Sequence, residues 1–501
     1  MPQIDHIQDI DTLRQAARLL ERENDRLHAK IRQLTEEISR LRGEEAGNAQ
    51  KELAFLQELL RQRESALFGD SSERRRGPRS PSSGNGREKT GHGPRAQPQL
   101  PVVEEFYDLE RRDCPVCGGD LREMSGQTED SEEITVVERR FILVKQRRRK
   151  YRCQCNASVV TAPGPDKLTP GGRYTPAFAV EVASSKYLDH LPLERQVKIM
   201  GREGLMVESQ TLWDQLNVLG HHLQPTYEAL GERVLSSALV FADETWWRLM
   251  DGKAPKRWWV WGVASDDAVF YRIQDSRGKA SAKTLLNGYE GIVMADGYGV
   301  YSALSRDGPS FRLVNCWTHA RRKFVEIEES FPKESAEMVG LIGELYGVED
   351  RLPRWDRSAG DDEQRTVLAE RKRIRDEHSR PIVDRIRNWI YEQRPLPRSG
   401  LGTAVSYLGD RWKGFTAFLE DPRVPLDNNA AERALRGIVL GRKNHYGSRS
   451  KRGTEVAAIF YTLFESAKLV GVEPKRYVLK VTLEAIRRPG AVTLPESLLS
   501  Q

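Results

Sequence analysis

Two short apolar segments with nearly the same pattern constrain most strongly what this chain can fold into. Residues 239–243 read Leu-Val-Phe-Ala-Asp and residues 292–296 read Ile-Val-Met-Ala-Asp, so each run ends in Ala-Asp. Apolar runs of this length that are rich in Val and Ile indicate buried strands. An aspartate just past such a strand lies at the edge of a sheet, where polar side chains can meet. A third acidic residue, Glu432, follows far downstream in a segment that predicts a helix.

Asp243, Asp296 and Glu432 together are the residue types that a pair of Mg²⁺ (or Mn²⁺) ions needs for phosphodiester chemistry, because hard cations take oxygen ligands. Each residue also has a structural explanation. Asp296 forms an ordinary turn dipeptide with the glycine after it, and Asp243 could cap a turn. Glu432 could be the third helical residue of a capping box begun by Asn429, or could pair with Arg436 one turn further on. The residues alone leave these alternatives open.

The strands around the two aspartates predict a particular sheet. Residues 257–263 and 268–273 are β-rich runs joined by a short polar segment, which is a hairpin signal. The strand before Asp296, a helix, and a further strand at 311–316 follow. This order is like that of the ribonuclease H core, in which the first and fourth strands are neighbours. In such a sheet, Asp243 and Asp296 would face each other.

A long helical segment separates the second and third acidic residues. Residues 325–420 are mostly helical by pattern and too long for a simple loop, so we expect an all-α insertion into the core. Trp355, Trp389 and Trp412 lie in this segment. Stacking on a DNA base is one possible role for them, and packing in a core is the more common one. Five further tryptophans, between residues 246 and 261, are expected to pack on the sheet.

The N-terminus carries a heptad repeat of apolar residues. Leu recurs every seventh residue at one position of the repeat, and mostly Ile or Ala, with one Asn, occupies the position three before it. The repeat consists of Leu13, Leu20, Leu27, Leu34 and Leu41, with Ile10, Ala17, Asn24, Ile31 and Ile38. Leu at d and Ile at a favour a parallel dimer, and a buried Asn fixes its register. An ordinary amphipathic helix is the alternative. Residues 71–100, rich in Pro, Gly, Ser and Arg, predict a flexible basic linker that holds DNA loosely or is simply solvated.

Four cysteines in two close pairs predict a structural Zn²⁺ site. The ligands would be Cys114, Cys117, Cys153 and Cys155. Two pairs of thiolates suit tetrahedral zinc, although the second pair is C-x-C rather than C-x₂-C, and unligated thiols are the alternative. Between the pairs runs a basic, strand-like segment suited to phosphate contacts or to solvent: Arg147, Arg148, Arg149 and Lys150.

Two further segments predict contacts with DNA. Helices at 193–200 and 208–219, separated by a break, have helix-turn-helix spacing, which many helical domains share without binding DNA. Basic residues on a Gly-rich segment follow Glu432 and suit a phosphate-backbone track, with a solvated loop as the alternative. These basic residues are Arg433, Arg436, Arg442, Lys443, Arg449, Lys451 and Arg452.

Composition narrows the class of protein. The 501 residues are too many for one core, and the net charge is only +6, so the clustering of basic residues says more than their total. We find no signal-peptide pattern and no apolar stretch near the ~18 residues of a membrane helix, and therefore expect a cytoplasmic protein without membrane contact. Five cysteines in a chain of this length do not suggest a disulfide scaffold.

The chain resembles transposases of the insertion-sequence-66 family, a branch of the acidic-triad (DDE) transposases, over nearly its whole length. The motifs are Leu-Phe-Gly at 67–69, Cys-Pro-Val-Cys-Gly-Gly at 114–119, Ala-Asp-Glu-Thr at 242–245, Asp-Gly-Tyr at 296–298, Cys-Trp-Thr-His-Ala-Arg-Arg-Lys-Phe at 316–324, Asp-Asn-Asn-Ala-Ala-Glu-Arg-Ala-Leu-Arg at 427–436 and Arg-Lys-Asn at 442–444. The resemblance implies that Asp243, Asp296 and Glu432 are the catalytic triad. Cys316 and His319 are similar to a motif of transposases with helical insertions. One Cys and one His make only half a zinc site, so we expect them to hydrogen-bond or pack.

The resemblance also implies an activity and partners. The expected reaction is Mg-dependent cleavage at the ends of a mobile element and 3′-OH strand transfer into target DNA. The expected partners are the element's terminal inverted repeats, target DNA, a second copy of the chain through the coiled coil, and small accessory proteins of the element. The protein would then be bacterial and associated with the nucleoid. A non-catalytic dimeric zinc-containing repressor, or a ribonuclease H-like nuclease without strand transfer, are the alternatives.

Together these features predict a multidomain α+β protein. The expected segments are a coiled coil with a short helix (1–69), a basic linker (70–100), a zinc module (101–165), a helix-turn-helix-like domain (166–235), a ribonuclease H-like α/β core in two parts (236–324 and 421–470), its helical insertion (325–420), and a C-terminal helix and tail (471–501).

Overall fold

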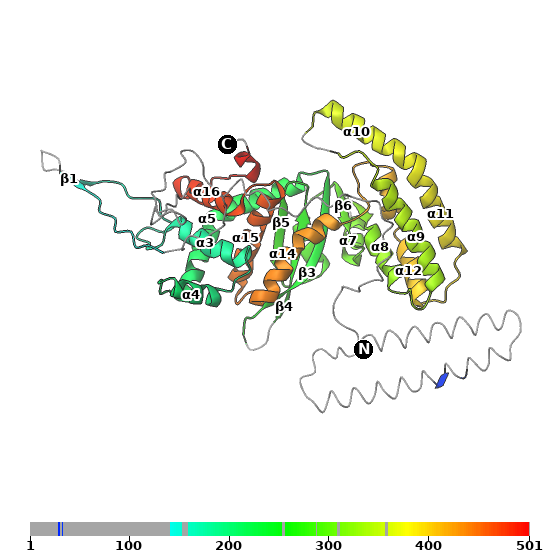
Figure 1. The fold of residues 1–501 in the computed structure, drawn as a ribbon, viewed down its shortest axis with the longest axis horizontal. Helices are drawn as coiled ribbons and strands as arrows, with labels where there is room; N and C mark the ends of the chain where they lie inside the picture. Colours follow the sequence, from blue (N-terminus) through cyan, green and yellow to red (C-terminus); the bar gives the residue numbers. More distant parts are fainter. Residues whose placement is uncertain are drawn as a thin grey trace, which may run out of the picture. The chain divides into compact units, whose positions relative to one another are not determined.

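In the computed structural model, the strands around the two Ala-Asp segments form one five-stranded mixed sheet (Figure 1). The strands are β3 (Leu239–Leu249), β4 (Lys256–Ala264), β5 (Val269–Gln274), β6 (Ile292–Ala295) and β7 (Arg312–Asn315), in the order β5-β4-β3-β6-β7. β4 is antiparallel to β3 and β5, while β6 is parallel to β3 and β7. The predicted hairpin and the predicted adjacency of the first and fourth strands are both confirmed.

The structure describes residues 29–30, 33, 141–152, 159–252, 256–286, 288–307, 311–355 and 359–499. Almost all of the predicted coiled coil, the linker, and the four cysteines of the predicted zinc site lie outside these residues. Within them, a short ribbon pairs β1 (Lys150–Arg152) with β2 (Val159–Thr161). No helix in this part of the chain is long and apolar enough to cross a membrane.

Helices pack on both faces of the sheet. Consecutive residues of a strand point to opposite faces, so Trp261 and Gly262 of β4 identify the two sides. Trp261 packs edge-on against the ring of Tyr301 in α7 (Gly299–Arg306). A side chain at Gly262 would meet Leu435 of α14 (Asn429–His445). The sheet therefore lies between α7 on one face and α14 on the other.

The free edge of β5 is covered by α15 (Lys451–Leu469). Ser466 of that helix accepts a hydrogen bond from the Val269 amide at 3.0 Å, and Thr462 accepts one from the Tyr271 amide at 3.1 Å. Covering an edge in this way prevents the strand from pairing with another chain. α15 is apolar along nearly its whole length because it is buried against the sheet as well as other helices.

The helices expected as a separate domain at 166–235 share one core with the sheet. α3 (Pro176–Tyr187) and α4 (Leu193–Arg202) pack on α5 (Ser209–Leu235), which in turn packs on α15 and β5. α5 is also longer than the predicted second helix at 208–219, since its buried leucines continue to Leu230. The helix-turn-helix spacing is present, but α5 is a supporting element of the sheet along much of its length.

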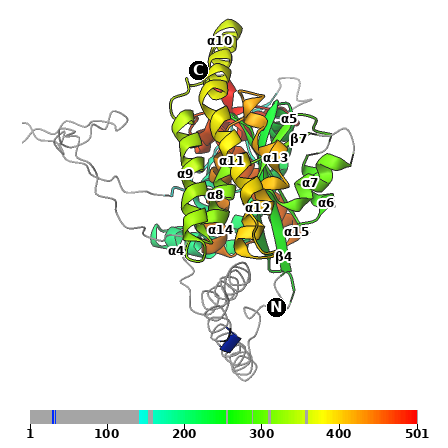
Figure 2. The same cartoon turned by 90° about the vertical axis from the view of Figure 1, so that its right-hand side faces the viewer.

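Residues between α8 (Trp317–Val325) and α14 are mainly helical, as predicted. They form α9 (Pro332–Glu349), α10 (Asp361–Ile374), the π-helical turn η2 (Arg375–Ser379), α11 (Arg380–Glu392), α12 (Gly400–Gly409), α13 (Trp412–Phe415) and the short turn η3 (Ala417–Leu419). Figure 2 views this group from the side; α9 packs on α8 and α11, and α12 packs on α8. α16 (Pro474–Arg487) and the turn η4 (Pro495–Leu498) complete the described chain.

The insertion has a charged residue at its centre. Arg375 is fully buried and its guanidinium donates two hydrogen bonds to the Glu349 carboxylate, at 2.8 and 2.7 Å. It also donates to the Phe418 carbonyl at 2.9 Å. A buried guanidinium requires such partners, because an unpaired charge in a low-dielectric interior is costly. Arg375 thus links η2 to α9 through Glu349 and to η3 through Phe418.

Candidate active site

The register of two parallel strands brings Asp243 and Asp296 together. Leu239 pairs with Ile292 and Phe241 with Met294, so two further residues along each strand put Asp243 beside Asp296. Neighbouring strands are roughly 4.8 Å apart. The two aspartates therefore leave the sheet at the same point and on the same face.

Asp243 does not end its strand, contrary to expectation. β3 continues to Leu249 by pairing with β4 along its whole length, whereas β6 stops at Ala295. Beyond Phe241, no described strand covers the β6 side of β3 until Ser448 forms a parallel bridge with Leu249 at its far end. Asp243 therefore lies at the step where a sheet edge opens, and this step brings it close to α14.

The open edge of β3 is fastened to both ends of α14. The Asn428 side chain, just before α14, donates to the Ala242 carbonyl at 2.9 Å. Near the other end, Arg442 donates to Thr245 Oγ1 at 2.9 Å and to the Trp246 carbonyl. Both residues are buried. These bonds satisfy edge groups that would otherwise lack partners, and they hold α14 alongside Asp243.

Cys316, which follows β7, also contacts the start of α14. Its amide donates to the Ala295 carbonyl at 3.2 Å, and its sulfur accepts a hydrogen bond from the Asn428 amide at 3.3 Å. Burial raises the pKa of the Cys316 thiol. Cys316 therefore lies between the end of β6 and the start of α14, as a packed hydrogen-bonding group.

Glu432 lies in the first turn of α14, but it does not cap the helix. The cap is Asn428 rather than Asn429, and it makes no side-chain capping bond, so the capping-box alternative is excluded. Oxygen Oε1 of Glu432 is buried without a hydrogen-bond partner in the described structure. Nε2 of His319 lies 3.8 Å from it. An orphaned buried carboxylate oxygen is costly, and this one lies among acidic neighbours.

The charges of the neighbouring carboxylates act on Asp243. The pKa of Asp243 is raised from 3.8 to about 8, first by burial and then by the charges of Glu244, Asp296 and Glu432. The Glu244 amide donates to Asp243 at 2.8 Å and partly opposes the shift. Burial lowers the pKa of His319, so its imidazole is neutral at pH 7 and leaves the negative charges uncompensated.

A fourth acidic residue, Glu244, was not predicted as part of this site. Its carboxylate is buried and accepts two hydrogen bonds from Arg277, at 3.0 and 2.6 Å, and one from the Tyr301 hydroxyl at 3.0 Å. The Arg277 guanidinium also lies over the rings of Trp259 and Tyr298. The Ala-Asp-Glu-Thr motif placed Glu244 next to Asp243, but nothing in the sequence marked Arg277, which lies in the loop after β5.

This donor set suits a hard divalent cation. Among the described residues, no Lys or Arg forms an ion pair with Asp243, Asp296 or Glu432, in contrast to Glu244. A Mg²⁺ site that holds no ion has oxygen donors, negative charges that repel one another, and oxygens without hydrogen-bond partners. In the part of the chain described, no three such side chains yet stand at ligating distance from one point. To share an ion with the two aspartates, Glu432 would have to turn away from His319.

The predicted DNA contacts fall into two groups. Most have exposed side chains: Arg147, Arg148, Arg149, Lys150, Arg433, Arg436, Lys443, Arg449 and Lys451. Arg449 among them pairs with Glu194 at 3.0 Å. Arg442 is only 8% exposed and bonds to β3, so its prediction as a phosphate contact is corrected. Arg452 is half-buried and donates to Asn217 at 2.8 Å. Arg442 was misjudged because a run of basic residues gives no sign of which ones are turned inward, and Arg452 stays a prediction.

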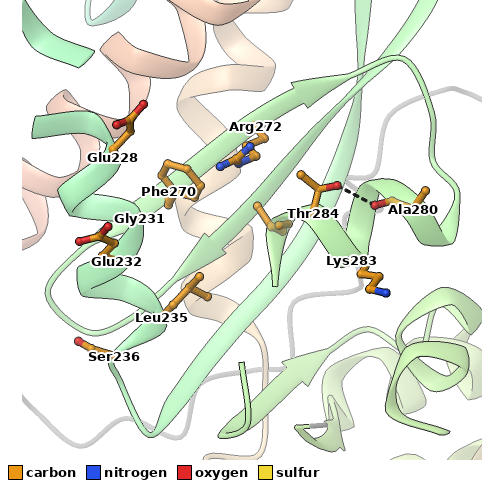
Figure 3. Close-up of a pocket in the computed structure, with 11 residues that line it drawn as sticks. Glu228, Gly231, Glu232, Leu235, Ser236, Phe270, Arg272, Ala280, Lys283 and Thr284 are labelled. Atoms are coloured by element: carbon orange, nitrogen blue, oxygen red, sulfur yellow. Dashed lines mark hydrogen bonds between the residues drawn. The ribbon is translucent and has the colours of Figure 1, made fainter. Parts of the chain in front are cut away.

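A separate hollow lies between α5, β5 and α6 (Lys279–Leu285) (Figure 3). Its lining includes Glu228, Glu232, Phe270, Arg272 and Lys283. None of the carboxylates at the β3 step takes part in it. The acidic site is thus a surface step at an open sheet edge rather than this hollow.

Comparison with known proteins agrees with the motifs. The profile described as "Transposase IS66 family" matches residues 171–456, which contain all three carboxylates. The chain is 29% identical over 420 residues to uncharacterized protein y4jD of Sinorhizobium fredii, covering 80% of each chain. It is 30% identical over 396 residues to uncharacterized protein y4hP of the same organism, covering 75% of this chain and 71% of that one. The chain belongs to the IS66 family of transposases.

Proposed function

We propose that this protein is a DNA transposase that cuts at the ends of its element and joins the freed 3′-OH to target DNA. The observation that carries the proposal is that the register of β3 and β6 makes Asp243 and Asp296 neighbours, with the charge of Glu432 close enough to raise the pKa of Asp243. Among the described residues, no Lys or Arg forms an ion pair with these three carboxylates. The strand order β5-β4-β3-β6-β7, with β3, β6 and β7 parallel, supports a ribonuclease H-like core. A repressor that only binds DNA has no need of such a cluster.

Asp243, Asp296 and Glu432 would hold two Mg²⁺ or Mn²⁺ ions. When bound, such ions lower the pKa of an attacking water or 3′-OH and stabilise the leaving oxygen. The protein itself positions the three carboxylates and sets their protonation. Asp243 has to release its proton to become a ligand, and the bonds of Asn428 and Arg442 hold α14 so that Glu432 can reach the two aspartates.

The exposed basic residues of α14 would position the DNA. Arg436 and Lys443 are four and eleven residues after Glu432 and therefore lie on the same side of the helix. Both are exposed. Phosphate contacts from such residues fix the register of a DNA strand without reading its sequence. In this proposal, the basic segment 147–150, zinc held by the four cysteines, and a dimer formed by the coiled coil would add further contacts with the two element ends.

A strand-transfer assay tests the proposal. The substrate is DNA that flanks the gene, and it is incubated with a target plasmid and Mg²⁺. The wild type should cleave and join, whereas Glu432→Gln should lose activity by at least about 100-fold, because one metal ligand becomes a weaker neutral donor. Glu290→Gln is the matched control, since Glu290 is exposed and precedes the opposite end of β6.

Three results would contradict the proposal in different ways. Equal activity of wild type and Glu432→Gln would remove Glu432 from the site. Cleavage without joined product would favour a nuclease. Specific DNA binding without cleavage would favour a repressor, provided that the two DNA ends are held together in one complex with the protein.

A further inference from the structure

Trp246 is unusual among the tryptophans of this chain. All ten lie in the described residues, and Trp246 is the most exposed of them, at 37%. Its neighbours on the hairpin differ, because Trp247 and Trp261 are fully buried. Packing on the sheet therefore accounts for the other aromatic rings of the hairpin but leaves much of Trp246 open to solvent.

A buried arginine holds this exposed ring. The Arg442 guanidinium lies 3.8 Å from the centroid of the Trp246 ring. Its hydrogen bonds to Thr245 and to the Trp246 carbonyl fix the guanidinium in place. Burying the charge costs free energy, which shows as a lowering of the Arg442 pKa to about 10. The ring is thus fixed from one side by a group that is unavailable for DNA phosphates.

The ring lies close to the acidic step. Trp246 is the third residue after Asp243 on β3, a separation of roughly 10 Å along an extended strand. It lies on the part of β3 that β6 does not cover, and it is joined through Arg442 to α14. The exposed Arg436 and Lys443 of that helix are about 10 Å apart along its axis. Alternation along β3 turns the Trp246 side chain away from the face of Asp243, but its contact with Arg442 of α14 holds the ring at the uncovered edge of β3. A DNA strand that approaches the acidic step along this edge would meet the ring.

We propose that the Trp246 ring is a stacking site for an unpaired nucleobase next to the phosphate that is cut, and that Arg442 is the positioning residue of this ring. This inference rests on the proposed function, because it takes DNA as the substrate of the acidic step. A flat aromatic ring that is held by a guanidinium and is partly exposed suits the π-face of any base, and therefore unpaired DNA rather than a duplex. Rigid backing reduces the entropy lost when a base stacks.

The test is a binding measurement that needs no catalysis. The full-length protein is titrated without added Mg²⁺ or Mn²⁺ with two 12-nucleotide probes, an oligo-dT strand and a strand of the same length with abasic residues in place of bases. Both probes carry the same phosphates, so basic side chains contribute equally to both. The wild type should bind the base-containing probe about tenfold more tightly, as expected for stacking of a base on an aromatic ring.

Variants separate a stacking role from a structural one. Trp246→Leu should remove the preference for bases and leave the affinity for the abasic probe unchanged, while Trp246→Phe should keep most of it. Arg442→Lys should weaken the preference, since the ring loses its backing. The preference is read as the ratio of the two affinities within each variant, so a change in phosphate binding affects both probes alike. Trp258→Leu is the matched control, because Trp258 is a partly buried ring that faces Trp247 across the same hairpin.

The proposal is overturned if Trp246→Leu keeps the preference, or if Trp258→Leu loses it equally. Its failure is distinct from failure of the proposed transposase activity. Loss of the preference in Trp246→Leu, together with full strand transfer by Glu432→Gln, would leave the stacking site standing and remove the catalytic assignment. The reverse pair of results would remove the stacking site alone.

Discussion

At the scale of single residues, the properties of Asp243 follow from its surroundings. Burial and three acidic neighbours raise its pKa to about 8, so the metal-free protein carries a proton there at pH 7. The adjacent Glu244 is also buried, but it has Arg277 and Tyr301 as partners. Two neighbouring residues of one strand therefore have different roles, because one has a basic partner and the other does not.

The raised pKa makes a prediction about stability. The folded protein holds the Asp243 proton more tightly than the unfolded chain, whose aspartate has a pKa near 3.8. The stabilisation by this proton is therefore complete below about pH 4 and is lost as the pH rises through about 8. Asp243→Asn imitates the protonated form. In EDTA, its free energy of unfolding should rise relative to wild type between pH 5.5 and pH 9.

Denaturant titrations of both proteins at several pH values provide the measurement. Asp410→Asn serves as the control, because Asp410 is exposed and its difference from wild type should stay flat. Parallel stability curves for wild type and Asp243→Asn would show that Asp243 is not held in its protonated form.

At the scale of elements, α14 is positioned by the junction that precedes it. The buried Asn428 links Ala242 of β3 to Cys316 after β7, and the buried oxygen of Glu432 lies one turn further on. The 112 positions between Cys316 and Asn428 include the whole insertion, yet the two residues are hydrogen-bonded. A long insertion can therefore leave the acidic step intact.

Asn428→Ala should disturb both stability and activity. Loss of the buried amide leaves the Ala242 carbonyl without this partner, which should cost about 1–3 kcal/mol of unfolding free energy. Strand transfer should fall because Glu432 is no longer fixed, and the loss should appear in kcat more than in DNA affinity. Asn444→Ala on the same helix is the control, as Asn444 is exposed and bonds only within its own helix. Equal effects of both substitutions would contradict the positioning role.

The sheet and the two aspartates could be predicted from the sequence, because apolar runs and hairpin signals are local. The length of β3 could not, since residues 244–249 stay extended only because β4 pairs with them. Arg442 was misjudged for a related reason. Only the fold reveals that Arg442 reaches the open edge of β3 and that Arg452 bonds to Asn217 of α5. Arg277 gave no signal, because its partner Glu244 lies 33 positions away.

At the scale of the whole molecule, the described chain consists of a core built on one sheet and a helical insertion. The core supplies the acidic step, and the insertion lies between β7 and α14 along the chain. Its centre is the buried pair of Arg375 and Glu349, with Phe418 as a further acceptor. We expect the integrity of the insertion to depend on this pair, because α10 buries no side chain of its own.

Arg375→Ala should destabilise the protein by about 3–5 kcal/mol, because it leaves Glu349 buried without its main partner. Arg373→Ala should change the stability very little, since Arg373 forms exposed ion pairs with Glu370 and Glu377. Thermal and denaturant unfolding of the two variants measure the difference. Similar losses for both would show that the buried pair does not hold the insertion together.

The central claim is that Asp243, Asp296 and Glu432 form one metal site. Calorimetric titration with Mn²⁺ at pH 8.5, where Asp243 is mostly ionised, tests it most directly. The wild type and Glu290→Gln should bind Mn²⁺ with the same affinity. Asp243→Asn, Asp296→Asn and Glu432→Gln should each bind at least about tenfold more weakly, because each loses a charged ligand. Unchanged Mn²⁺ affinity in all three variants would contradict the claim.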